Sequence, residues 1–238
     1  MAPDLVLLHG FTHTGASWDQ VVVALAERYR PLAPDIRGHG AASDVRPVSV
    51  AGVVSDVSAL ATEPFELAGY SMGGRLALHV ALALPERVDR LVLIGASPGI
   101  ADPAARAERR AADERLAAEV EGMTIEAFAQ RWAQTAVLAD QPPAVQEAVH
   151  ADRLRSTPDG LAEALRGLGT GALPSLWERL AELTAPVDLV VGERDAKFAA
   201  IARDMAAALP RARVHVVAGA GHAVHLEAPG AVAEVVAA

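Results

Sequence analysis

The six residues Gly69-Tyr70-Ser71-Met72-Gly73-Gly74 decide how this chain of 238 residues folds. They follow the apolar run from Phe65 to Ala68, which predicts a strand, and they open a segment with helical spacing. Glycine on both sides of a serine lets the chain turn sharply between strand and helix, and the Ser71 hydroxyl then projects above the carboxyl end of a sheet. By itself the pattern also fits an ordinary glycine-rich turn, so its interpretation depends on what surrounds it.

Short apolar runs alternate with helical segments on both sides of this turn. That alternation is typical of a parallel sheet whose strands are joined by crossover helices. The almost continuous apolar character of Leu91 to Ile94 and of Leu189 to Val191 favours strands that helices cover on both faces. We therefore expect an α/β fold with one mostly parallel sheet. The predicted strands are residues 5–8, 31–35, 65–68, 88–94, 187–191 and 214–217.

The alternation stops between residues 101 and 183, where alanine, charge and helical spacing dominate. A loop of that length without secondary structure is uncommon in a compact domain. Prolines and glycines, as in Pro142-Pro143 and Gly167 to Gly171, divide the segment into several helices. We expect residues 1–100 and 184–238 to form the core, with residues 101–183 inserted into it as a helical cap.

A serine is activated by a histidine, and that histidine needs a third group to fix its tautomer. Asp195 stands just after the fifth predicted strand, at the same sheet edge as Ser71, whereas Asp188 begins that strand and belongs to the opposite edge. His222 follows the last predicted strand behind two small residues, and His225 is its nearest alternative. The order serine, acid, histidine predicts the α/β-hydrolase fold with Ser71, Asp195 and His222 as its catalytic triad.

Negative charge that forms on a substrate oxygen requires hydrogen-bond donors that are already in place. In this fold the donors are the backbone N–H groups of the residue after the serine and of a residue after the first strand, here Met72 and Phe11. We expect His9 to order the loop that carries Phe11. A phosphate-binding loop is the other interpretation of the glycine-rich stretches, but the chain lacks both G-x-x-x-x-G-K-[ST] and G-x-G-x-x-G.

The chain carries a formal net charge of -9 and has an isoelectric point near 5.3, which argues against binding nucleic acid or an anionic membrane through its overall field. No apolar run approaches the length of a transmembrane helix, and the first residues do not resemble a secretion signal. Cysteine is absent, and the histidines and carboxylates do not fall at metal-ligand spacing. We expect a cytoplasmic protein, a monomer or small homo-oligomer, that acts on a small molecule without a metal or a cofactor.

Arginine binds carboxylates through two parallel hydrogen bonds, so its position along the chain is informative. Arg75 follows Ser71 by four residues, about one helical turn, and therefore points toward the same site. Arg109, Trp132 and Arg155 are further candidates for ligand binding in the predicted cap. For each arginine the alternative is a solvated surface residue or one that pairs with a nearby carboxylate.

Together these motifs resemble one family, the 2-succinyl-6-hydroxy-2,4-cyclohexadiene-1-carboxylate synthases of menaquinone biosynthesis. The similarity covers the serine turn with Arg75, the stretches 96–100 and 106–110, the acid loop from Gly192 to Phe198 and the histidine loop from Ala220 to Glu227. The pair Lys197-Phe198 in the acid loop is the more specific part of it, because ordinary esterases share the remaining motifs loosely.

The resemblance implies a reaction: elimination of pyruvate from 2-succinyl-5-enolpyruvyl-6-hydroxy-3-cyclohexene-1-carboxylate, with the triad as the base that abstracts a proton. It also implies that Arg75, Arg109 and Arg155 bind the carboxylates of this polycarboxylate substrate, and that Tyr70 and Trp132 shape the pocket.

The residues alone leave two other functions open. One is a serine hydrolase that attacks esters or carbon-carbon bonds through a covalent Ser71 intermediate. The other, which an intact triad disfavours, is a ligand receptor without catalytic activity, because a fold does not determine a function.

Overall fold

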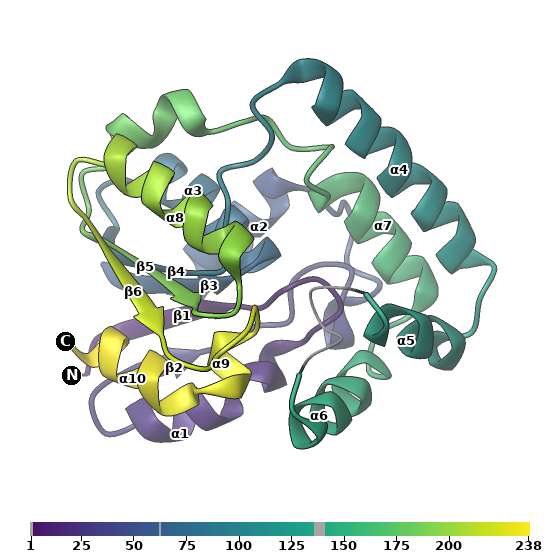
Figure 1. Cartoon of the computed structure of the whole chain (residues 1–238), viewed down its shortest axis with the longest axis horizontal. Coiled ribbons are helices and arrows are strands. Elements are labelled where there is room, and N and C mark those ends of the chain that lie inside the picture. Colours follow the sequence, from purple (N-terminus) through teal and green to yellow (C-terminus); the bar gives the residue numbers. More distant parts are fainter. Residues whose placement is uncertain (1, 62, 136–140) are drawn as a thin grey trace.

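One sheet of six strands forms the centre of the protein in the computed structural model, which describes residues 2–61, 63–135 and 141–238. The strands lie in the order β2-β1-β3-β4-β5-β6, and every neighbouring pair is parallel. The expected α/β architecture is therefore confirmed (Figure 1). The strands are β1 (Asp4–Leu8), β2 (Arg30–Leu32), β3 (Phe65–Tyr70), β4 (Val88–Ile94), β5 (Val187–Gly192) and β6 (Ala212–Val217).

Helices cover both faces of the sheet, with α1 and α10 on one face and α2, α3 and α8 on the other (Figure 1). Alternate residues of each strand point to opposite faces, so Leu5 and Leu7 of β1 pack with α1 and α10, while Val6 and Leu8 pack on the other side. The core helices are α1 (Asp19–Leu25), α2 (Val50–Leu60), α3 (Met72–Ala83), α8 (Ala196–Ala208), α9 (Val224–Glu227) and α10 (Pro229–Ala237), with the 3-10 helices η1 (Gly15–Trp18) and η2 (Gly40–Ala42).

The second strand is shorter than its apolar pattern predicts. The prediction covered residues 31–35, but β2 ends at Leu32. Pro34 has no N–H to donate to a strand ladder. Asp35 accepts hydrogen bonds from the N–H groups of Gly15 (2.7 Å) and Ala41 (2.7 Å) and so serves a turn instead of the sheet. That turn packs beside the loop that follows β1.

Between β4 and β5 the chain forms helices and no strand among its described residues, in the region predicted to be a cap. Phe128, Leu161 and Leu165 form a small apolar cluster of their own there. The last part of the region, around Leu176 and Leu180, packs with the main core instead. Residues 136–140 of the predicted cap lie outside the described residues. The helices are α4 (Pro103–Glu121), α5 (Ile125–Ala133), α6 (Pro143–Arg153), α7 (Pro158–Leu168) and the 3-10 helix η3 (Trp177–Glu182).

No helix within the described ranges is long and apolar enough to cross a membrane.

Candidate active site

Ser71 lies in a strained turn between β3 and α3. Its φ is +51° and its ψ is -108°, a conformation that costs a residue with a side chain about 1–3 kcal/mol. A Cβ on Gly73 would lie 2.1 Å from the carbonyl oxygen of Leu8, and one on Gly69 would lie 2.4 Å from that of Gly73, so the turn closes only with glycine at these positions. This is the sharp strand-to-helix turn that the G-x-S-x-G pattern predicts.

The structure brings the three predicted triad residues into one hydrogen-bonded chain. Nε2 of His222 is 3.2 Å from Oγ of Ser71, and Nδ1 of His222 is 2.6 Å from Oδ2 of Asp195. A carboxylate only accepts hydrogen bonds, so Nδ1 carries the proton toward Asp195 and Nε2 is free to accept the proton of the Ser71 hydroxyl. Asp195 is itself held at the N-terminus of α8, where its Oδ1 accepts a hydrogen bond from the N–H of Phe198 (3.2 Å).

The two other candidates for the triad, His225 and Asp188, do not contact Ser71. His225 is fully buried against Tyr70 and Trp18, its ring nitrogens have no hydrogen-bond partner among the described atoms, and burial lowers its pKa well below the ordinary value. Asp188 is at the opposite edge of the sheet, where it pairs with Arg90 at 2.7 Å. Neither residue is in position to act on Ser71.

The loop after β1 is held in place by a neutral histidine. Nε2 of His9 accepts a hydrogen bond from the N–H of Ile36 (2.9 Å), which leaves Nδ1 to donate to the carbonyl of Gly10 (2.9 Å). Burial lowers the pKa of His9 to about 4, so the ring stays uncharged at neutral pH. Phe11 follows directly, and Thr12 after it has a φ of +70°. Phe11 and Met72 both line the pocket at Ser71, as expected of the two residues predicted to supply backbone donors.

Met72 is the first residue of α3, and the first N–H groups of a helix have no carbonyl partner within it. They carry partial positive charge and favour a nearby anion. The Met72 N–H is therefore suited to an oxygen that becomes negative beside Ser71.

A pocket of about 410 Å³ opens above Ser71 between the core and the helices that follow β4. The aromatic side chains of Phe11, Trp132, Trp177 and Phe198 and several aliphatic ones form much of its lining. Three cationic side chains, those of Arg75, Arg109 and Lys197, reach the same pocket. An apolar site with a few charged groups is typical of an enzyme that binds a small anion.

Arg75 is the deepest of these cations. Its side chain is buried, one Nη donates to the carbonyl of Leu168 (3.1 Å), and its Nε has no hydrogen-bond partner among the described atoms. Burial, followed by repulsion from Arg109, lowers the pKa of Arg75 to about 10, so it remains charged at neutral pH. Arg109 is anchored by Asp113, whose Oδ1 is 2.7 Å from its Nε. Arg75 thus has hydrogen-bonding capacity left for a ligand.

Two predicted binding residues do not line this pocket. Arg155 has a side chain that is 63% exposed, lies 3.9 Å from Asp152 in a loose ion pair, and borders a separate pocket of about 240 Å³. Tyr70 is buried beneath the site, where its ring packs on His222 (5.3 Å between centroids) and on His13 (5.8 Å). Tyr70 supports the triad from below, and burial raises its pKa.

Arg153, which no sequence motif singled out, is a buried cation that contacts the loop of Phe11 without lining the pocket. It ends α6 fully buried, its Nε donates to the Thr12 hydroxyl (3.2 Å), and one Nη has no partner among the described atoms. Its neighbour Asp152 accepts hydrogen bonds from the N–H and the hydroxyl of Thr14, and although burial raises the pKa of this carboxyl, its hydrogen bonds with His13 and Thr14 lower it to about 2. The end of α6 is thereby attached to the loop that carries Phe11.

Comparisons with known proteins agree with this geometry. The model of the alpha/beta hydrolase family matches residues 5–235. A Bacillus subtilis (strain 168) protein provisionally named 2-succinyl-6-hydroxy-2,4-cyclohexadiene-1-carboxylate synthase is 38% identical over 94% of this chain and 85% of its own length. The synthase of that name from Salmonella agona (strain SL483) is 33% identical over 98% of this chain and 92% of its own. The chain belongs to the 2-succinyl-6-hydroxy-2,4-cyclohexadiene-1-carboxylate synthases of the alpha/beta hydrolase family.

A solved structure supports this membership. The structure of MenH from S. aureus superimposes on this synthase-family protein with a TM-score of 0.93 at 30% identity, covering 99% of this chain and 92% of the other. The predicted α/β-hydrolase fold is therefore confirmed, and so is the family suggested by the sequence motifs. Within the described residues of this family member, no cluster of three or more histidine or carboxylate side chains is arranged to hold a metal ion.

Proposed function

We propose that this protein eliminates pyruvate from 2-succinyl-5-enolpyruvyl-6-hydroxy-3-cyclohexene-1-carboxylate to give 2-succinyl-6-hydroxy-2,4-cyclohexadiene-1-carboxylate, a step of menaquinone biosynthesis. One observation carries the proposal: a single pocket holds both Ser71, hydrogen-bonded to His222 (3.2 Å), and three cations. These are Arg75, Arg109 and Lys197. A simple esterase needs only the pair of Ser71 and His222, whereas an enzyme that acts on a tricarboxylate also needs cations that bind the carboxylates. The synthase names of the relatives agree with it.

The names of substrate and product define the chemistry. The ring double bond moves from C3–C4 to C4–C5, a new one forms between C2 and C3, and the enolpyruvyl oxygen leaves C5. The hydrogen that is lost therefore sits on C2, next to the succinyl ketone. Its electron pair forms the C2–C3 bond, and the bond at C5 breaks with both electrons on the enolpyruvyl oxygen. The departing pyruvate enolate takes up a proton at carbon. The reaction is neutral in oxidation state, so it calls for a base and an anion-stabilising site and for no cofactor.

The chain's own groups fit these demands. His222 draws the proton from the Ser71 hydroxyl, which then removes the hydrogen from C2, and Asp195 holds the imidazole in the required tautomer. The succinyl ketone oxygen becomes enolate-like and is stabilised by the N–H groups of Phe11 and Met72. These donors act on charge that exists mainly in the transition state, which is why they accelerate the step and do not only bind the substrate.

The carboxylates of the substrate are held by cations from two layers. Arg75 reaches up from the core helix α3, Arg109 reaches down from α4, and Lys197 stands at the start of α8. We assign residues 101–183 the role of a cap that excludes water from this pocket. Arg153 contributes by fixing the loop of Phe11. We place the reaction in the cytoplasm, with a small polycarboxylate as the partner of the site.

The test compares two reactions in one preparation: pyruvate release from the proposed substrate and hydrolysis of a short chromogenic ester. Wild-type protein is expected to release pyruvate rapidly and to cleave the ester slowly, and Ser71→Ala is expected to lose pyruvate release while keeping its fold. Ester cleavage that depends on Ser71, without any pyruvate release, would replace the proposal with a serine hydrolase that forms a covalent intermediate.

A further inference from the structure

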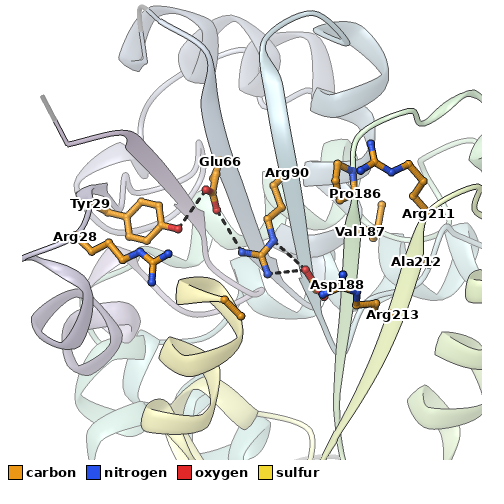
Figure 2. A pocket seen from close by; sticks show the side chains of 11 residues that line it. Arg28, Tyr29, Glu66, Arg90, Pro186, Val187, Asp188, Arg211, Ala212 and Arg213 are labelled. Carbon is orange, nitrogen blue, oxygen red and sulfur yellow. Dashed lines mark hydrogen bonds and ion pairs between the residues drawn. The ribbon is translucent and has the colours of Figure 1, made fainter.

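A second cavity, of about 470 Å³, opens at the edge of the sheet opposite to Ser71. It shares no lining residue with the catalytic pocket. Figure 2 shows Arg28 and Tyr29 on one side of it, Arg211 and Arg213 on the other, and Arg90 with Glu66 and Asp188 between them. Ala238 also lines this cavity.

Charged residues form a row across the middle of this cavity, because the pairing of the strands places them side by side. Glu66 of β3 is paired with Arg90 of β4, and Asp188 of β5 is paired with Arg213 of β6. Side chains two residues further along the same strands, such as Ala68 and Val190, belong to the apolar layer beneath α1 and α10. The charged row therefore lies where the apolar core ends and water begins.

Part of this row is explained by the fold alone. Arg90 binds Oδ2 of Asp188 through Nε (2.9 Å) and Nη2 (2.7 Å), and it donates to the carbonyls of Val235 (2.7 Å) and Val236 (2.8 Å) at the end of α10. Asp188 also faces His215, with 2.7 Å between its Oδ1 and Nε2. Arg90 and Asp188 are thus a structural pair that attaches α10 to the sheet.

The remaining arginines have no such explanation. Arg28, Arg211 and Arg213 are exposed, and their side chains form no hydrogen bond or ion pair with the described part of the chain, although the protein as a whole has a net charge of -9. Glu66 is shared among several groups, since its Oε1 accepts a hydrogen bond from Tyr29 (3.2 Å), its Oε2 is 3.8 Å from Arg90, and the charge of Arg28 acts on it as well. Four arginines therefore share one cavity with two side-chain carboxylates.

We propose that this cavity is a second binding site, for a small molecule that carries at least two anionic oxygen groups. Arg28 and Arg213 approach from opposite sides, so one ligand satisfies both when its anionic groups are separated (Figure 2). The volume lies in the range of sites that enclose small organic molecules. Guanidinium groups bind phosphates and carboxylates alike through paired hydrogen bonds. The site is independent of the chemistry proposed at Ser71.

Calorimetric titration at low ionic strength tests the proposal, with pyrophosphate as the phosphate probe and citrate as the carboxylate probe. The test variants are Arg28→Gln and Arg213→Gln, whose exposed side chains can be replaced without disturbing the core. Arg115→Gln, an exposed arginine of α4, controls for net charge. Arg109→Gln controls for binding in the catalytic pocket. Thermal melts confirm that every variant is folded.

We expect one probe to bind saturably to the wild type, and each test variant to weaken it about tenfold, as the loss of a hydrogen bond between charged groups does. The control variants should leave the affinity unchanged. The tighter of the two probes shows whether the natural ligand is a phosphate or a polycarboxylate. Saturable binding of neither probe, equal weakening by Arg115→Gln, or weakening by Arg109→Gln with no effect of Arg213→Gln would overturn the proposal.

Discussion

The loops of the sheet and the helices that follow β4 both contribute to the Ser71 pocket, but they are built differently. Ser71 directly follows β3, and Asp195 and His222 lie in the loops after β5 and β6, so the frame of the sheet fixes their positions. Arg109 and Trp132 come from α4 and α5, helices that contribute to an apolar cluster of their own. We infer from this difference that the loops of the sheet carry out the reaction, whereas binding depends on the inserted helices together with Arg75 and Lys197 of the core. Changes in the catalytic loops should lower kcat, and changes in the side chains that bind the substrate should raise KM.

Removal of the serine hydroxyl is expected to have the largest effect. Ser71→Ala should lower kcat by about 10³-fold or more with little change in KM, because general base catalysis is lost while the cations of the pocket remain. Ser71→Gly should be equally inactive but more stable than Ser71→Ala, since glycine adopts a φ of +51° without strain. Steady-state kinetics and thermal melts measure both. A large rise in KM for Ser71→Ala would remove the distinction between the two regions.

Arg75 should show the opposite behaviour, although it belongs to a core helix. Arg75→Ala is expected to raise KM about 10-fold to 100-fold and to change kcat less, because a buried charge-assisted hydrogen bond to a carboxylate is worth about 1.5–3 kcal/mol. Arg75→Lys keeps the charge but loses the paired hydrogen bonds, so its KM should lie between those of the wild type and Arg75→Ala. Equal kinetics of Arg75→Ala and wild type would remove this arginine from substrate binding.

Arg153, the last residue of α6, and Arg155, in the turn that follows it, provide a matched pair. Arg153→Met should lower kcat/KM about tenfold, because the loop of Phe11 loses a buried anchor. Arg155→Met changes an exposed side chain at another pocket and should have no effect. The comparison is made on pyruvate release at saturating and at low substrate. Equal losses in both variants would show that the end of α6 acts through its helix and not through Arg153.

The neutral histidines under the catalytic loops should make stability fall in acid. Burial lowers the pKa of His9 to about 4 and that of His39 to about 3, against 6.5 in an unfolded chain. Between pH 6.5 and about 4 the unfolded state therefore binds more protons, so the free energy of unfolding decreases as the pH falls, by about 1.4 kcal/mol per pH unit for each histidine. Above pH 6.5 this contribution is complete.

Urea unfolding at pH 7.5 and at pH 5.0 measures this dependence. Between these two pH values His39→Asn should lose about 2 kcal/mol less stability than the wild type, because the histidine contributes about 1.4 kcal/mol per pH unit and only below pH 6.5. Curves for the variant and the wild type that stay parallel would mean that His39 is not kept neutral by the fold.

The sequence predicted the residues on the loops of the sheet better than those on the helices that follow β4. Asp195 and His222 were predicted as partners of Ser71 because each follows a predicted strand, and the structure places them in the loops after β5, which ends at Gly192, and β6, which ends at Val217. Arg153 was not predicted, because its burial depends on how α6 packs against the loop of Phe11, which no local pattern shows. Arg155, which was predicted to bind the substrate, lies in the turn after α6 with an exposed side chain. Lys197 was noticed in the acid loop, but its place in the pocket depends on how α8 begins.

The second cavity, at the edge of the sheet opposite to Ser71, could not be predicted either. Arg90 and Arg213 lie far apart in the sequence, and only the pairing of β4, β5 and β6 brings them into one row. Strand order is a long-range property that a single sequence does not reveal.

The most direct test of the account is the rate of pyruvate release in a single turnover from substrate that carries deuterium at C2. Single-turnover conditions separate this step from product release. If Ser71 and His222 remove that hydrogen, the deuterated substrate reacts measurably more slowly than the ordinary one in the wild type. Equal rates for the two substrates, with pyruvate release still lost in Ser71→Ala, would contradict a proton-abstracting triad and favour covalent attack by Ser71.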